Sequence, residues 1–275
     1  MLPLQGLNKY ENIKLRVFLE RHDFSLPAIA EMTISEHEKE IAEFGKNDDF
    51  WIFGYGSLIW KPPPHYDKRV PGYIEGYVRR FWQASEDHRG TPSSPGRVVT
   101  LIDHAHWLTL RARDAHPASE RVWGAAYHIP THHVAEVREY LDLREINGYS
   151  IQFTPFHPAS SVGDEKPATT PIRCLVYIGL PSNPQFVGPQ DPRELARHIL
   201  QSRGPSGENR EYLYMLEEGL KGLSGESGDE HVADLVRECR RIEREEGARE
   251  EVEVIGVPLH RKGSVEEQEE VEKLG

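Results

Sequence analysis

The sequence predicts an α+β fold with a mixed or barrel-like sheet, and three observations lead to this prediction. Short runs rich in aromatic and β-branched residues follow one another with few helices between them, which disfavours a doubly wound sheet. Helical patterns gather mainly in the second half of the chain. The 275 residues, 37% of them hydrophobic, can bury a substantial core.

Residues 1–49 are predicted to be an N-terminal extension. A charged helical stretch begins at Ser35, and the pair Ser35 and Glu38 has the residue types of a capping box. The polar run 46–49 then breaks the helical pattern. We therefore place a domain boundary between residues 49 and 50.

The strand predictions rest on short β-branched and aromatic runs that stop at glycine, proline or polar residues. The predicted strands are 50–53, 73–81, 97–102, 121–129, 151–156 and 172–180. Residues 103–120, between the predicted strands 97–102 and 121–129, are expected to form a hairpin connection with additional residues inserted in it. Residues 157–171, rich in proline and serine, are expected to be a surface loop.

Helical spacing of apolar residues predicts the remaining elements. The predicted helices are 132–144, one opened by Asp191-Pro192, 208–223, and a charged helix at about 229–246. Asp191 is the expected N-cap of its helix, with proline in the first turn. Residues 50–223 are thus predicted to be one domain, and 224–275 an acidic helix and tail.

The charge is unevenly distributed. The chain has a net charge of −12, and residues 225–275 alone carry 16 acidic and 8 basic side chains. The nearly neutral body offers no basic face for nucleic acid. No apolar run approaches the length of a membrane span, no signal-peptide core follows Met1, and two cysteines cannot form a disulfide framework. A cytoplasmic protein is therefore expected.

A glycine-rich turn is the first candidate site. A buried-type strand runs into Gly54-Tyr55-Gly56-Ser57, and two glycines let the backbone bend and present N–H groups to a carboxylate or a developing oxyanion. A dinucleotide fingerprint and a nucleophile elbow both require glycine where Ile59 stands, and the lysine of a phosphate loop is absent. An ordinary tight turn remains the alternative.

Glu145 is the second candidate. It lies where a predicted helix ends, near the apolar Ile146 and Tyr149. Such surroundings can raise the pKa of a carboxyl group and make it a general base; a solvated surface glutamate is the alternative.

The polar loop 87–92 is a third candidate. Its charged side chains could orient a ligand, or they could only form hydrogen bonds with the backbone of the loop itself.

The 14 histidines include two suggestive pairs, His104 with His106 and His132 with His133. No His-Glu-x-x-His motif or carboxylate-rich loop accompanies them, so the sequence does not indicate a zinc site. A Ser-His-Asp triad is also not indicated, because Ile59 occupies the position where a nucleophile elbow around Ser57 would require glycine.

Several segments in order resemble the ChaC family of glutathione-specific γ-glutamylcyclotransferases. The matching segments are 53–60, 79–83, 87–92, 95–101, 140–145, 177–179, 183–184 and 204–207, followed by Asn209 and 211–213. The resemblance covers about residues 50–223. It implies a γ-glutamylcyclotransferase-like fold, a small mixed β-barrel flanked by helices, with 50–223 as the catalytic domain.

The resemblance also implies a site without metal or cofactor. Glu145 would be the catalytic residue, and Tyr212 would line the site. The residues implied to bind the γ-glutamyl group are Ile52, Phe53, Gly54, Tyr55, Gly56, Ser57 and Leu58. This chain departs from the family at Ile146, where lysine is typical, and in the longer segment 103–120.

The activity implied is cyclisation of the γ-glutamyl group of glutathione into 5-oxoproline with release of Cys-Gly. Three alternatives stay open: a cyclotransferase for other γ-glutamyl amino acids or amines, a non-catalytic protein that binds a γ-glutamyl ligand, and an interaction module centred on the acidic tail with an unknown protein partner.

Overall fold

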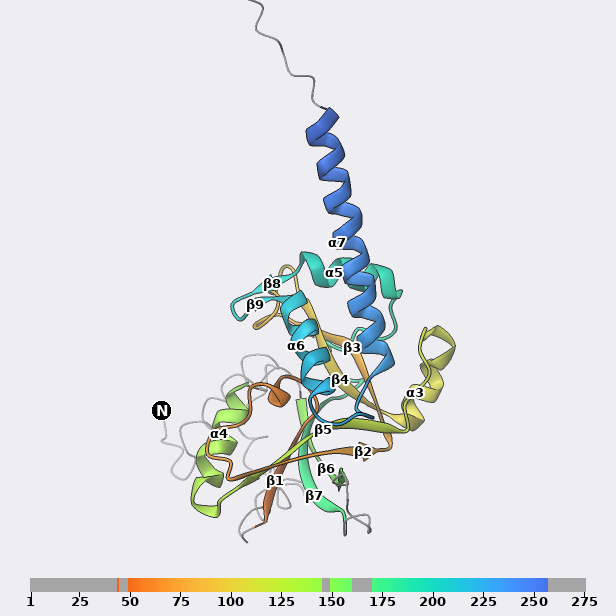
Figure 1. Cartoon of the computed structure of the whole chain (residues 1–275). Coiled ribbons are helices and arrows are strands. Elements are labelled where there is room, and N and C mark those ends of the chain that lie inside the picture. The colour runs from red at the N-terminus through yellow and green to blue at the C-terminus, as the bar shows by residue number, and fades with distance from the viewer. Residues whose placement is uncertain (1–43, 45–48, 145–148, 160–169, 257–275) are drawn as a thin grey trace, which may run out of the picture. The chain divides into compact units, whose positions relative to one another are not determined.

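The protein is described here by a computed structural model that covers residues 44, 49–144, 149–159 and 170–256 (Figure 1). Most of the predicted extension 1–49 lies outside the described residues, including its helix before Phe44. Glu145 and most of the predicted loop 157–171 also lie outside them.

Five strands form a closed barrel. They are β1 (Phe50–Gly54), β2 (Lys68–Glu75), β5 (Arg121–Ile129), β6 (Tyr149–Pro158) and β7 (Ile172–Gly179). Their order around the barrel is β1-β5-β2-β6-β7, and β1 closes the barrel by pairing with β7 in parallel while its neighbours pair antiparallel. The α+β fold with a mixed barrel, predicted from the sequence, is confirmed.

Strand β1 lies in the centre of the packing. All five of its residues are buried, which matches a strand covered on both faces and its aromatic and β-branched composition. Its register with β5 pairs Phe50 with Ile129 and Gly54 with Ala125. Gly54 is thus the last residue of a fully packed strand, so the turn after it starts from a firmly held point.

The predicted strand 73–81 is wrong in one respect. Gly76 has φ of +83°, a conformation that favours glycine, and the chain turns there. The segment is therefore divided between β2 and β3 (Tyr77–Ser85). Strand β3 pairs antiparallel with β4 (Gly96–Asp103), outside the barrel.

The predicted hairpin at 103–120 is also wrong. The chain forms helix α3 (His104–Leu110) and a 3-10 turn η3 (Arg111–Arg113). The side chain of Asp103 accepts hydrogen bonds from the backbone N–H groups of Ala105 and His106, which satisfies the first donors of the helix. The capping aspartate was the sequence signal for this helix.

Four longer helices and several short elements complete the fold. The helices are α4 (Val134–Arg144), α5 (Pro192–Gln201), α6 (Asn209–Lys221) and α7 (Glu230–Gly256); the short elements are η2 (Ser57–Ile59), η4 (Thr131–His133), β8 (Arg203–Gly204) and β9 (Gly207–Glu208). Asp191 caps α5 as predicted, accepting from the N–H groups of Arg193 and Glu194. Within the described part of the chain, no helix combines the length and apolar content of a membrane span.

Helix α7 packs along α5 and α6 (Figure 1). Its first half buries one apolar face, made of Val232, Leu235, Val236, Cys239 and Ile242. This half is therefore part of the packed structure, although the sequence analysis assigned it to the tail.

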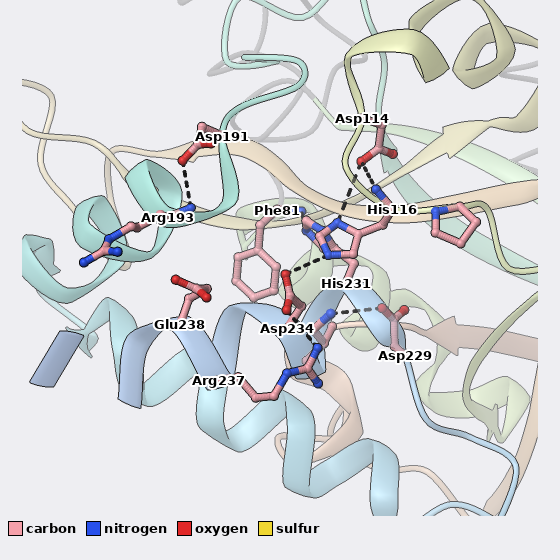
Figure 2. Close-up of polar contacts among 12 residues, drawn as sticks. Phe81, Asp114, His116, Asp191, Arg193, Asp229, His231, Asp234, Arg237 and Glu238 are labelled. Atoms are coloured by element: carbon pink, nitrogen blue, oxygen red, sulfur yellow. Dashed lines mark hydrogen bonds and ion pairs between the residues drawn. The ribbon is translucent and has the colours of Figure 1, made fainter. Parts of the chain in front are cut away.

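Polar contacts fix the start of α7 against β3 (Figure 2). Asp229 accepts a hydrogen bond from the N–H of Val232, and its carboxylate pairs with the guanidinium of Arg79 at 3.2 Å. The N–H of Phe81 donates to Nε2 of the buried His231 at 3.1 Å. Helix α7 is thus tied to the strand that follows the Gly76 turn.

Candidate active site

A cleft of about 60 Å³ opens where β1 runs into the glycine turn. The lining residues are Phe53, Gly54, Tyr55, Gly56, Ser57, Leu58, Val99, Tyr177 and Tyr212. The structure therefore brings six predicted residues of the turn together with Tyr212 of α6, which is more than 150 positions away in the sequence. Val99 of β4 and Tyr177 of β7 complete the wall.

The two glycines of the turn are required by close approach. A Cβ atom on Gly54 would lie 2.5 Å from Cβ of Leu58, and one on Gly56 would lie 3.0 Å from both the Tyr212 hydroxyl and Cγ2 of Val99. The turn continues into η2, where the N–H of Ile59 donates to the carbonyl of Gly56 at 3.0 Å. A larger residue at position 56 would therefore project into the cleft.

Tyrosine hydroxyls anchor the turn to the barrel. The hydroxyl of Tyr127 in β5 donates to the carbonyl of Leu58 at 2.7 Å, and the hydroxyl of Tyr55 donates to the carbonyl of Tyr177 at 2.8 Å. Burial raises the pKa of Tyr127, so its hydroxyl stays protonated as the donor. These bonds hold the turn in one position before any ligand arrives.

Tyr212 is held by aromatic neighbours. It is 7% exposed, and its ring packs edge-on against Trp60, with centroids 5.2 Å apart, and against Phe81, with centroids 5.9 Å apart. Such pairs fix both the position and the tilt of the ring. Its hydroxyl is thereby directed toward Gly56 across the cleft.

A buried cation lies behind this wall. Arg79 is 2% exposed and interacts electrostatically with Tyr212 and Tyr55. Burial lowers the pKa of its guanidinium, and the ion pair with Asp229 opposes that change. The Asp229 carboxylate, 3.2 Å away, offsets much of the Arg79 charge, so Arg79 serves mainly to fix the packing behind Tyr212.

Two predicted site residues are not among the lining residues. Ile52 is completely buried in β1 and does not line the cleft. Glu145 lies outside the described residues; it follows Arg144, the last residue of α4. The polar loop 87–92 contributes the buried Arg89, which bonds the carbonyl of Glu208 at 2.8 Å and so supports the chain before α6.

Sequence reasoning missed Val99 and Tyr177. Both belong to short segments of the resemblance, 95–101 and 177–179, whose members were not given roles. Their side chains reach the cleft because β4 and β7 pass beside the turn, which is a property of the tertiary structure. Arg79 was likewise part of a matching segment without an assigned role.

Comparison with known proteins places these features in a family context. A family model described as "ChaC-like protein" matches residues 50–242. The glutathione-specific gamma-glutamylcyclotransferase of Schizosaccharomyces pombe is 48% identical over 191 residues, which cover 70% of this chain and 92% of that protein. The glutathione-specific gamma-glutamylcyclotransferase 1 of Homo sapiens is 36% identical over 201 residues, covering 71% and 82% respectively.

A solved structure is also similar. The crystal structure of a gamma-glutamylcyclotransferase specific to glutathione from yeast matches with a TM-score of 0.62 at 37% identity. The match covers 71% of this chain and 97% of that one. Nearly the whole of that structure therefore has a counterpart in this chain.

Proposed function

Since this chain belongs to the ChaC-like protein family, we propose that it degrades glutathione by cyclising the γ-glutamyl group to 5-oxoproline and releasing Cys-Gly. The observation that carries the proposal is the convergence of the glycine turn and Tyr212 on one cleft. Relatives at 48% and 36% identity bear the name of this activity. Phe53, Gly54, Tyr55, Gly56, Ser57, Leu58 and Tyr212 are proposed to surround the γ-glutamyl group.

The reaction needs positioning more than it needs a reactive protein group. The α-amine of the γ-glutamyl group attacks its own γ-carbonyl, a carbon–nitrogen bond forms within a five-membered ring, and the amide bond to cysteine breaks. The proton lost by the amine is balanced by the proton gained by the leaving amine of Cys-Gly. A cleft that holds the group curled can supply much of the rate, because the reacting atoms are already close.

The turn and the groups behind it have complementary tasks in this proposal. Backbone N–H groups of the turn hold the substrate and stabilise charge on the carbonyl oxygen. Arg79, paired with Asp229 at 3.2 Å, interacts electrostatically with Tyr55 and Tyr212. Arg79 would act here as a positioning residue for these two tyrosines.

We propose Glu145 as the general base. The amine is mostly protonated near neutral pH, so a base must remove a proton before the ring can close, and the same group can return a proton to the leaving amine. In the sequence, Glu145 follows Arg144, the last described residue of α4.

The first test is an assay on Glu145→Gln. We expect the wild type to release 5-oxoproline and Cys-Gly in equal amounts from reduced glutathione, and the variant to bind glutathione but lose at least about 100-fold in turnover. Glu139→Gln is the matched control, because Glu139 is an exposed glutamate of α4, six positions before Glu145 in the sequence. Wild-type turnover in Glu145→Gln would remove Glu145 from the mechanism.

The assay also separates the alternatives. Product from γ-Glu-Ala but none from glutathione would keep the chemistry and change the substrate. Binding without product from either compound would favour a protein that senses γ-glutamyl ligands. A cytoplasmic location and a protein partner for residues 224–275 stay predictions, which fractionation and affinity capture with the tail deleted would test.

A further inference from the structure

Three polar side chains from distant parts of the sequence meet away from the cleft. They are His65, in the segment between η2 and β2, His133 at the end of η4, and Glu136 in the first turn of α4. One ligand atom from each lies within 4.8 Å of the other two. None of the three lines the cleft, so none is among the residues proposed to surround the γ-glutamyl group.

The distances within this cluster suit a small metal ion. Nε2 of His65 lies 3.0 Å from Oε1 of Glu136, and Nδ1 of His133 lies 3.5 Å from Oε2 of the same carboxylate. Zinc bonds of about 2.0–2.1 Å to nitrogen and oxygen place neighbouring tetrahedral ligand atoms about 3.3 Å apart. Both histidine–carboxylate distances are close to this value, and the ligand atoms of the two histidines lie within 4.8 Å of each other.

Charge also favours a cation here. The hydrogen bond from His65 holds the pKa of Glu136 below its usual value, and His133 adds to this effect. The carboxylate is thus ionised at neutral pH. Two imidazole nitrogens and one carboxylate form a donor set typical of zinc, with a further coordination position left for water.

The backbone holds one ligand in an unusual conformation. His65 has φ of +59°, and among the described residues it is the one non-glycine residue with positive φ. This left-handed region is uncommon for side chains larger than glycine and is often retained where a side chain has a task. The conformation brings the His65 ring against the His133 ring, with centroids 4.0 Å apart.

One adjustment is needed for coordination. The two rings are parallel to within 8°, whereas a metal ion lies close to the plane of each imidazole that binds it. At least one ring must therefore rotate. The side chains are 37% and 31% exposed for His65 and His133, so solvent leaves room for this rotation.

We propose that His65, His133 and Glu136 bind a divalent transition-metal ion of the zinc class. The ion connects the segment after the glycine turn to α4. Glu136 lies eight positions before the end of α4, so the ion sits about 12 Å along the helix from Arg144. Metal binding would hold the helix that leads to Glu145 against the body of the protein.

The sequence could not show this group. His132 and His133 stood out as a pair, but only His133 belongs to the cluster, and His65 lies 71 residues from Glu136. Sequence motifs for metal sites consist of residues that are close together along the chain. The residues of this cluster come together only in the tertiary structure, so no motif indicates them.

The test is titration of the full chain with Co²⁺, which reports coordination by its visible absorption, and competition with Zn²⁺. We expect one ion per chain, with a visible d–d absorption band of bound Co²⁺ that disappears when Zn²⁺ takes the site. In His65→Ala and Glu136→Gln, affinity should fall at least about tenfold and the band should disappear.

Two controls separate this site from adventitious binding to the other histidines. His132→Ala removes an exposed neighbour of His133 that is not in the cluster, and His106→Ala removes a histidine of α3; both should bind Co²⁺ like the wild type. Equal affinity in all four variants, or no band in the wild type, would overturn the proposal.

Hydrogen exchange gives a second readout. Added Zn²⁺ should slow amide exchange in residues 134–144 of the wild type and leave it unchanged in Glu136→Gln. Binding without any change in α4 would contradict the proposed connection. These measurements need no substrate, so they can fail without affecting the cyclotransferase proposal, and the reverse also holds.

Discussion

At the scale of single residues, the absence of a side chain shapes the cleft. Gly56 faces the Tyr212 hydroxyl and Val99 at distances that leave no space for a relaxed Cβ. Gly54 is even closer to Leu58. The glycines are therefore required for the approach of packed neighbours, and the flexibility of a tight turn is a secondary matter.

Gly56→Ala should reduce activity more than stability. Its Cβ would lie 3.0 Å from the Tyr212 hydroxyl and from Val99, so these groups must move by a few tenths of an ångström and the cleft must change shape. We expect kcat/KM for glutathione to fall at least about tenfold, since small misplacements at a reacting centre are costly. Circular dichroism and thermal unfolding would report the fold.

The matched control is Gly225→Ala, because a Cβ at Gly225 meets nothing within 4 Å. That variant should keep wild-type kinetics. Wild-type kcat/KM in Gly56→Ala would show that the wall formed by Gly56 and Tyr212 does not contact the substrate.

At the scale of elements, helix α7 has two distinct parts. The family model ends at residue 242, and Ile242 is the last buried apolar residue of the helix among its described side chains. The boundary predicted at residues 223 and 224 stays a prediction that no comparison tests. We propose instead that the folded domain extends through the buried half of α7.

Two truncations test this boundary. A chain ending at Leu223 loses five buried side chains of α7, worth about 10 kcal/mol in total, comparable with the whole stability of about 5–15 kcal/mol of a typical domain. We expect it to be unfolded, whereas a chain ending at Ala248 should unfold at nearly the wild-type temperature. A cooperative, active protein ending at Leu223 would contradict this view of α7.

The start of α7 should also make stability depend on pH. His231 is 3% exposed, and burial, with the positive charges of Arg80, His116 and Arg79, lowers its pKa well below 6.5. The N–H of Phe81 already donates to Nε2 of His231. A proton on Nε2 would therefore place two N–H donors against each other. The folded state binds this proton less readily than the unfolded state. The contribution of His231 to the free energy of unfolding is therefore fully present above about pH 6.5 and is lost as the pH decreases.

Urea unfolding at pH 7.5 and 5.5 would measure the effect. We expect His231 to account for a loss of about 1.4 kcal/mol between these values, the maximum for one group over one pH unit below 6.5. His231→Gln keeps an acceptor for the N–H of Phe81 but cannot titrate. Between pH 7.5 and 5.5 the free energy of unfolding of this variant should therefore fall by about 1.4 kcal/mol less than that of the wild type. Equal losses in both proteins would show that His231 does not control this dependence.

At the scale of the whole described structure, the barrel and the helices belong to one compact unit. Cys174 lies in β7 and Cys239 in α7, and both side chains are completely buried. Burial raises the pKa of both thiols, that of Cys239 to about 12, so neither is reactive in the folded state. The two cysteines therefore report on the two layers separately.

Pulse labelling with a thiol reagent at increasing urea would follow both cysteines. We expect no labelling in native buffer and simultaneous labelling across the unfolding transition seen by circular dichroism, as for one cooperative unit. Peptide mapping identifies which cysteine reacts. Labelling of Cys239 at lower urea than Cys174 would mean that α7 separates before the barrel opens.

Local chemistry made much of this fold predictable. The strands at 50–53, 97–102, 121–129, 151–156 and 172–180 were found from β-branched and aromatic runs, with ends within a few residues of those observed. The cap of α5 was found from Asp191. The two errors came from local signals that were overlooked: the glycine at position 76, where the chain turns with a positive φ, and the capping side chain of Asp103.

The class of fold, the glycine turn and the family could be inferred from the order of the residues, because these features depend on neighbouring residues and on ordered motifs. Which distant side chains meet depends instead on the folded chain. Val99, Tyr177 and Tyr212 reach the turn from three separate elements, and Arg79 finds Asp229 150 positions later. Such contacts follow from how the barrel closes and the helices pack, which residue spacing along one chain does not encode.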